Sequence, residues 1–211
     1  MELLMAEELL LLAYRPRGTP SVNLEMLDYT LSAAVLAELV ILNRVTLENG
    51  HLRVRAPEPT GDTELDETLQ RLATHPGPPP AFGDWWISMY TPERRSRLLA
   101  RLVQRGVMTA ETRRYLRIFK EEVFPDRDPR PRESLHDRLR TALSGGRPDA
   151  RTSAFVSLAH ACRVLPAFLS AEERRRAKEI TAQDPVGALV SQSFAQAARE
   201  SIGRLAGGAS T

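Results

Sequence analysis

A helical periodicity between Asn23 and Asn43 is the feature that most limits the fold of this chain. Apolar residues recur there at steps of three and four, which places them on one face of an α-helix. Similar patterns predict further helices over 2–14, 62–74, 84–90, 92–105, 133–143, 151–168, 171–183 and 185–206. The sequence therefore predicts a mainly α-helical protein with about nine or ten helices.

The periodicity changes directly after this helix. In RVTLENGHLRV, residues 44–54, apolar side chains alternate around Asn49-Gly50, a dipeptide that favours a type I′ turn. We expect a β-hairpin there. Thr109 is expected to begin a short helical turn, YLRIF (115–119) is a candidate strand, and the charged FPDRDPRPRE that follows is a predicted loop.

The length of 211 residues suits one domain, which we place over 1–206 with a disordered tail at 207–211. Cys162 is the single cysteine, so an internal disulfide is excluded and a reducing, cytoplasmic compartment is expected. At the N-terminus, the uncharged run Leu9–Tyr14 is too short for a signal peptide or a membrane span, which favours a buried helix.

Motifs for catalysis, cofactor binding and metal binding are missing from the sequence. It has no glycine-rich phosphate loop, no His-Glu-x-x-His and no Gly-x-Ser-x-Gly, and its four histidines are scattered. The acidic stretch GDTELDE (61–67) has helical spacing, with Asp62 as a helix cap rather than a Ca²⁺ ligand. We therefore expect a non-enzymatic protein without a cofactor or metal.

Charge is distributed unevenly along the chain, although the net charge is only +2. Residues 1–75 carry 12 acidic and 6 basic side chains, and residues 76–211 carry 15 acidic and 23 basic ones, which gives balances of −6 and +8. The densest run of arginines lies between Asp84 and Gly106. A basic surface for an anionic partner is one interpretation of this run.

A helical projection of 92–105 separates its arginines into two groups. Arg95 projects into the middle of the apolar stripe, where a guanidinium needs a carboxylate, backbone carbonyls or a bound anion. Glu38 or Asp84 could supply an intramolecular carboxylate, and an anion near the helix N-terminus is the alternative. The other arginines are expected on a solvated face: Arg94, Arg97, Arg101 and Arg105.

Two adjacent tryptophans, Trp85 and Trp86, precede this helix. On a helix they cannot face the same way, so we expect one in the core and the other at the surface, where indole suits a membrane interface. Burial of both, in a loop, is the alternative.

Several segments together resemble the Golgi phosphoprotein 3 family, especially its bacterial members. They occur in family order and cover most of residues 5–168: MAEELLLLAY, LAELVILNRVTLENGHLRV, PTGDTELDETL, RLLARLVQRGVM and RTSAFVSLAHACRVL. The resemblance implies a single, mostly helical domain with short hairpins. It also implies a peripheral membrane adaptor that binds phosphatidylinositol 4-phosphate and the cytosolic tails of membrane proteins. A homo-oligomer is a further option, although the counterpart of the family's hydrophobic hairpin, FKEEVFPDRDPRPRE, is mostly charged here.

The family's headgroup pocket uses a tryptophan and three arginines. Counted without gaps, these positions fall on Asn23, Ser32, Pro92 and Arg95, so only Arg95 matches. The resemblance and the helical projection together predict a headgroup site at Arg95, with Arg94, Trp85 and Trp86 as further candidates.

Two other functions remain open at this point. The order of helix and hairpin over residues 23–55 is that of a winged-helix nucleic-acid binder, although this helix has no basic residue before Arg44. A protein-interaction scaffold without a lipid site is the second alternative.

Overall fold

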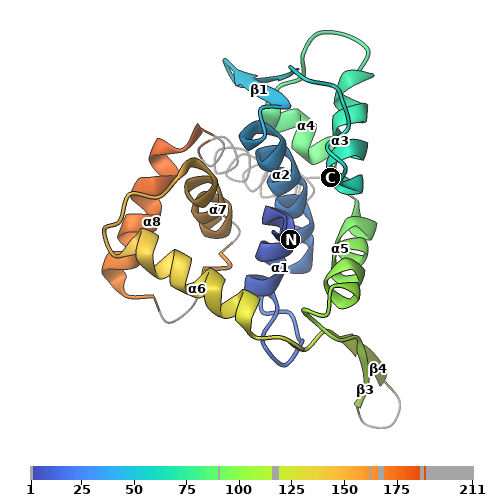
Figure 1. The fold of residues 1–211 in the computed structure, drawn as a ribbon, viewed down its shortest axis with the longest axis vertical. Coiled ribbons are helices and arrows are strands. Elements are labelled where there is room, and N and C mark those ends of the chain that lie inside the picture. Colours follow the sequence, from blue (N-terminus) through green and yellow to red (C-terminus); the bar gives the residue numbers. More distant parts are fainter. Residues whose placement is uncertain are drawn as a thin grey trace, which may run out of the picture.

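The computed structural model describes residues 2–89, 91–115, 119–161, 163–165, 169–185 and 188. It is mainly helical, with two short antiparallel hairpins at opposite ends of the molecule (Figure 1). Within the described residues the helices and strands are α1 (Met5–Ala13), α2 (Leu24–Ile41), β1 (Val45–Glu48), β2 (His51–Val54), α3 (Thr63–Ala73), α4 (Phe82–Ser88), α5 (Pro92–Gln104), β3 (Glu111–Tyr115), β4 (Phe119–Val123), α6 (Arg130–Leu143), α7 (Ala150–Ala161) and α8 (Ala171–Gln183).

Helices α1 and α2 form the centre of the fold. Every residue of α1 is buried, and α2 is buried from Leu27 to Leu39 apart from Tyr29. Helix α2 contacts α1, α3, α4, α5 and α7, and α6 and α7 both contact α8 (Figure 1). The predicted amphipathic helix over Asn23–Asn43 is therefore a central core helix, and its length is nearly as expected.

Local signals set most element boundaries as predicted. Asn49 and Gly50 have positive φ angles of 52° and 80° and connect β1 to β2, as a type I′ turn requires. The Asp62 side chain accepts hydrogen bonds from the backbone of Glu64 and Leu65 and begins α3. A reciprocal capping box begins α8 at Ser170.

The region between α5 and α6 differs from the prediction. No helical turn begins at Thr109, because the chain enters β3 at Glu111 and the Thr109 amide donates to the Pro125 carbonyl. A single strand is predicted over 115–119. In the structure β3 ends at Tyr115 and β4 begins at Phe119, and residues 116–118 between them are outside the described residues. Helix α6 begins inside the predicted loop, since Pro131 is well tolerated in a first helical turn.

Most of the C-terminal segment for which a helix and a tail are predicted lies outside the described residues. Helix α7 ends at Ala161 rather than at 168. Of the helix predicted over 185–206 only 185 and 188 are described, and the expected tail at 207–211 is not described. About nine or ten helices are predicted. The described residues contain α1 to α8.

Candidate functional site

The N-terminal end of α5 brings the candidate arginines against α2 and α3. Arg94 is wrongly predicted to lie on a solvated face, because its side chain is 1% exposed. Its guanidinium donates four hydrogen bonds. The acceptors are Glu64 at 3.1 Å, Ser32 Oγ at 2.7 Å, the backbone carbonyl of Met89 at 3.2 Å and Thr68 Oγ1 at 3.3 Å. Every one of these partners belongs to the fold, so we leave Arg94 out of the candidate site.

The remaining arginines of this predicted face also pack on the protein. Arg97 pairs with Glu64, Arg101 with Asp62 and Glu7, and Arg105 with Glu7. Only Arg97, with 41% of its side chain exposed, is substantially solvated. The face predicted to contact water therefore lies against acidic residues of α1 and α3.

These ion pairs explain the uneven charge along the sequence. Acidic side chains of the first 75 residues pair with arginines from α5, α6 and α7. Besides the pairs of α5, Glu8 contacts Arg138 and Arg151, and Glu38 contacts Arg151 at 3.0 Å. The balances of −6 and +8 thus describe two halves that attract each other, and most of this arginine run is structural.

Arg95 differs from its neighbours on α5. Its Nε lies 3.4 Å from Asp28 Oδ1 of α2, and the two side chains are 19% and 4% exposed. Both Asp28 Oδ1 and Arg95 Nη1 are buried without a hydrogen-bond partner in the described residues. The two charges are therefore close, but neither group is fully satisfied.

The partner of Arg95 differs from the two predicted carboxylates. Glu38 is taken by Arg151 and by the backbone amide of Met5, and Asp84 is exposed. Asp28 is one turn from the start of α2, which places it beside the first turn of α5. The sequence holds no local signal for this long-range contact.

Burial makes the Asp28 carboxylate costly to ionise. Desolvation raises its pKa from the ordinary 3.8 to about 6, Arg95 opposes this rise, and the negative charges of Glu25 and Glu93 add to it. Burial also raises the pKa of the neighbouring Tyr14, which Arg95 lowers in part. A carboxyl that titrates near neutral pH thus lies against the one α5 arginine with an unsatisfied buried nitrogen among the described side chains.

The two tryptophans both belong to α4. Trp85 is the core residue that one of the pair was predicted to be, because it is 8% exposed and its ring meets His75 edge to face at 4.9 Å. Its indole nitrogen is buried without a hydrogen-bond partner in the described structure, so Trp85 is not a membrane anchor here. The side chain of Trp86 lies outside the described side chains, and its predicted exposure stays a prediction.

The three non-matching pocket positions have structural tasks. Asn23 caps α2 by accepting from the Met26 amide, Ser32 accepts from Arg94, and Pro92 is the first residue of α5. Arg95 is therefore the only one of the four positions that offers a guanidinium.

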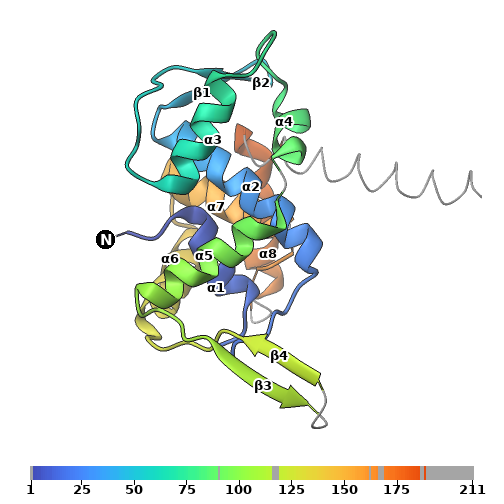
Figure 2. The same cartoon turned by 90° about the vertical axis from the view of Figure 1, so that its right-hand side faces the viewer.

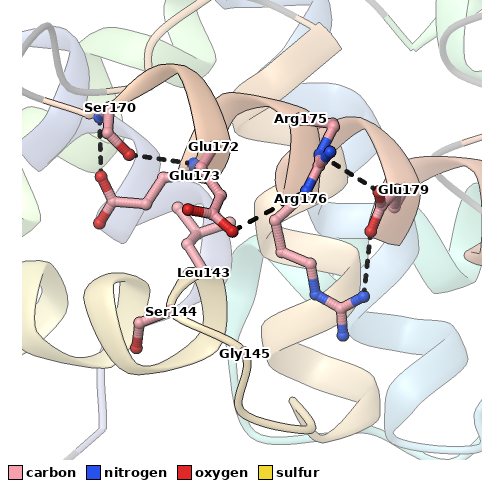
Figure 3. A pocket seen from close by; sticks show the side chains of 9 residues that line it. All are labelled: Leu143, Ser144, Gly145, Ser170, Glu172, Glu173, Arg175, Arg176 and Glu179. Carbon is pink, nitrogen blue, oxygen red and sulfur yellow. Dashed lines mark hydrogen bonds and ion pairs between the residues drawn. The ribbon is translucent and has the colours of Figure 1, made fainter.

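A separate hollow of about 460 Å³ lies between the end of α6 and α8 (Figure 3). Its arginines are already matched by acids of the same helix: Arg175 lies near Glu172 and Glu179, and Arg176 contacts Glu179 at 3.2 Å. With Glu173 added, its lining has three acids against two arginines, so this hollow has no positive charge left for an anion.

Two further geometric findings concern the described residues as a whole. Among them, no group of three or more histidine, cysteine, aspartate or glutamate side chains could hold a metal ion. None of the described helices is both long enough and apolar enough to cross a membrane.

Helix α2, the candidate recognition helix of the winged-helix alternative, is buried through its middle by the surrounding helices. It could not enter a DNA groove without unfolding the core.

The family model for Golgi phosphoprotein 3 (GPP34) matches residues 5–198. That match spans all of the described helices and both hairpins, so this chain belongs to the Golgi phosphoprotein 3 (GPP34) family.

Proposed function

We propose that this protein is a non-enzymatic peripheral membrane protein that binds an anionic phospholipid headgroup through Arg95. The family is known for binding phosphatidylinositol 4-phosphate at Golgi membranes. The observation that carries the proposal is the incomplete Arg95–Asp28 pair at the N-terminal end of α5. A cytoplasmic location and contact with cytosolic tails of membrane proteins belong to the same proposal.

A phosphate group would improve the surroundings of Arg95 in two ways. It would take the place of Asp28 beside the guanidinium and, once that carboxylate moves aside, give the buried Nη1 an acceptor; guanidinium–phosphate hydrogen bonds are stronger than those between neutral groups. It would also place negative charge at the positive end of the α5 dipole, where the arginine's own charge is unfavourable. Asp28 is then the intramolecular competitor that the headgroup displaces.

Cosedimentation with phosphatidylcholine vesicles containing phosphatidylinositol 4-phosphate tests this proposal. We expect Arg95→Ala to weaken binding by about tenfold, which corresponds to about 1.4 kcal/mol. Raising the salt from about 0.1 M to about 0.5 M should weaken wild-type binding as well, because salt screens exposed charges.

Arg147→Ala is the matched control. Arg147 is exposed, and its loss changes the net charge by the same amount. Equal binding by wild type and Arg95→Ala, with the fold of both intact, would refute the lipid site and favour the protein-interaction scaffold.

A further inference from the structure

A tight turn joins α1 to α2 and carries two arginines. The Gly18 amide donates to the Arg15 carbonyl at 2.7 Å, which closes a β-turn with Pro16 at its second position. Gly18 has a φ of +89°, a conformation that other residues rarely adopt. The Arg15 amide also donates to the Thr19 carbonyl at 2.9 Å, so the backbone of the turn is closed on itself.

The turn is fixed against the segment that follows the β3–β4 hairpin. The Phe124 amide donates to the Gly18 carbonyl and the Asp126 amide to the Pro16 carbonyl, each at 3.0 Å. A Cβ atom on Gly18 would lie 2.4 Å from the backbone nitrogen of Pro125, so only glycine allows this approach. The position of the turn relative to the projecting hairpin (Figure 2) is therefore set by the backbone.

A hollow of about 560 Å³ lies at this junction and is lined by Arg15, Pro16, Arg17, Thr19 and Arg113. The Arg15 Nη1 donates to the Pro20 carbonyl at 2.9 Å, which orients the guanidinium without neutralising it. Within the described part of the chain, neither Arg15 nor Arg17 has a carboxylate within 4.0 Å, whereas the arginines of α5 all do. Two exposed guanidinium groups thus lie at the hollow with their charge unpaired.

Arg113 supplies a third guanidinium from β3. It lies 3.5 Å from Glu111, and about half of each side chain is exposed, so this ion pair is weak. Glu121 is opposite Arg113 in the hairpin register but forms no ion pair with it in the described structure. Three arginines line the hollow, and Glu111 and Glu121 lie beside only one of them, so the charge around the hollow stays positive.

We propose that this hollow is a second anion site, separate from Arg95, that binds a phosphomonoester. A phosphomonoester carries a charge of about −1.5 to −2 at neutral pH, which is opposite in sign to the local charge. The planar fork of a guanidinium also fits two phosphate oxygens at once. The phosphate can belong to a lipid headgroup or to a soluble molecule, and the turn presents the same chemistry to both.

The first experiment follows inorganic phosphate binding by the backbone NMR signals of Arg17 and Thr19. In the wild type these signals are expected to shift and saturate. In the double variant Arg15→Gln, Arg17→Gln the apparent affinity should fall at least about tenfold, since two of the three guanidinium donors are removed. The matched control is Arg55→Gln, Arg147→Gln, which removes two exposed arginines elsewhere and should behave as wild type.

A second arm identifies the source of the phosphate by cosedimentation with vesicles containing phosphatidylinositol 4-phosphate. Weaker vesicle binding by the turn variant, relative to its control, supports the site with a lipid source. Unchanged vesicle binding, together with lost binding of inorganic phosphate, supports it with a soluble source. If the turn variant matches its control in both arms, the site does not exist.

The two sites can fail separately. Arg95→Ala should leave the phosphate-induced shifts of Arg17 and Thr19 unchanged, because Arg95 does not line this hollow. Loss of those shifts in Arg95→Ala would contradict a separate site.

Discussion

Replacing Arg94 by alanine is expected to lower the free energy of unfolding by about 3–5 kcal/mol, the range typical for breaking a buried ion pair. Arg94 and Glu64 are 1% and 3% exposed, and the guanidinium also serves Ser32, Thr68 and the Met89 carbonyl. The variant would leave several of these acceptors buried without a donor.

Chemical denaturation of the purified variants measures this effect. Arg97→Ala is the matched control, because Arg97 shares the partner Glu64 but is 41% exposed. It should lower the free energy of unfolding clearly less than Arg94→Ala does. Replacing both members as Arg94→Met, Glu64→Gln should recover part of the loss, since no buried charge is then left without a partner: Arg97, which also pairs with Glu64, is 41% exposed and keeps Glu67. A cost below about 1 kcal/mol for Arg94→Ala would show that the buried network is not as described.

Asp28→Asn is expected to stabilise the protein at neutral pH, which is the reverse of the usual result of breaking an ion pair. The folded-state pKa of Asp28 is raised from 3.8 to about 6, so the folded protein binds the proton more tightly than the unfolded chain. The stability that Asp28 contributes is therefore fully present below pH 3.8 and is lost as the pH rises through about 6. At about 1.4 kcal/mol per pKa unit, the free energy of unfolding that is lost when Asp28 ionises is at most about 3 kcal/mol.

Unfolding curves between pH 5 and pH 7.5 check the sign of the stability difference between Asp28→Asn and wild type. The stability advantage of Asp28→Asn over wild type should grow by about 1 kcal/mol across this range, because wild-type Asp28 ionises there. Asp84→Asn is the control, since Asp84 is exposed, is not among the charges that shift the pKa of Asp28, and should show a much smaller change. An Asp28→Asn variant that is less stable than wild type at pH 7.5 would mean that the Arg95 pair outweighs the desolvation of Asp28.

The same variant connects stability to the proposed function. Removing the Asp28 charge also removes the intramolecular competitor for Arg95. We therefore interpret Asp28 as a residue that lowers both stability and affinity at neutral pH, a combination more typical of binding sites than of purely structural ion pairs.

Most of the fold could be predicted because its signals are local. The Asn49-Gly50 turn, the Asp62 cap and the Ser170 capping box each depend on a few neighbouring residues, and all three occur as expected. The residues alone show little of the β3–β4 hairpin, because its strands, ETRRY and FKEEV, are too polar for a clear alternation; only the family resemblance indicates a hairpin that includes FKEEV.

The surroundings of the arginines were harder to predict, because a projection of one helix cannot show what packs against it. It placed Arg94 in water, whereas α2 and α3 enclose it. The acidic partners come from α1, α2 and α3, far away in sequence. The opposite charges of the two halves of the chain are the one signal in the sequence, and only the ion pairs of the structure show that they reflect pairing within the molecule.

The most direct test of the central claim observes the Arg95 side chain itself. The Nε–Hε NMR signal of Arg95, assigned by its loss in Arg95→Lys, is followed while the soluble headgroup inositol 1,4-bisphosphate is added. If the headgroup takes the place of Asp28, this signal shifts and saturates with the binding curve, and Asp28→Asn saturates at a lower concentration. If the ligand binds while the Arg95 signal stays in place, Arg95 is only a structural partner of Asp28 and the proposed headgroup site is wrong.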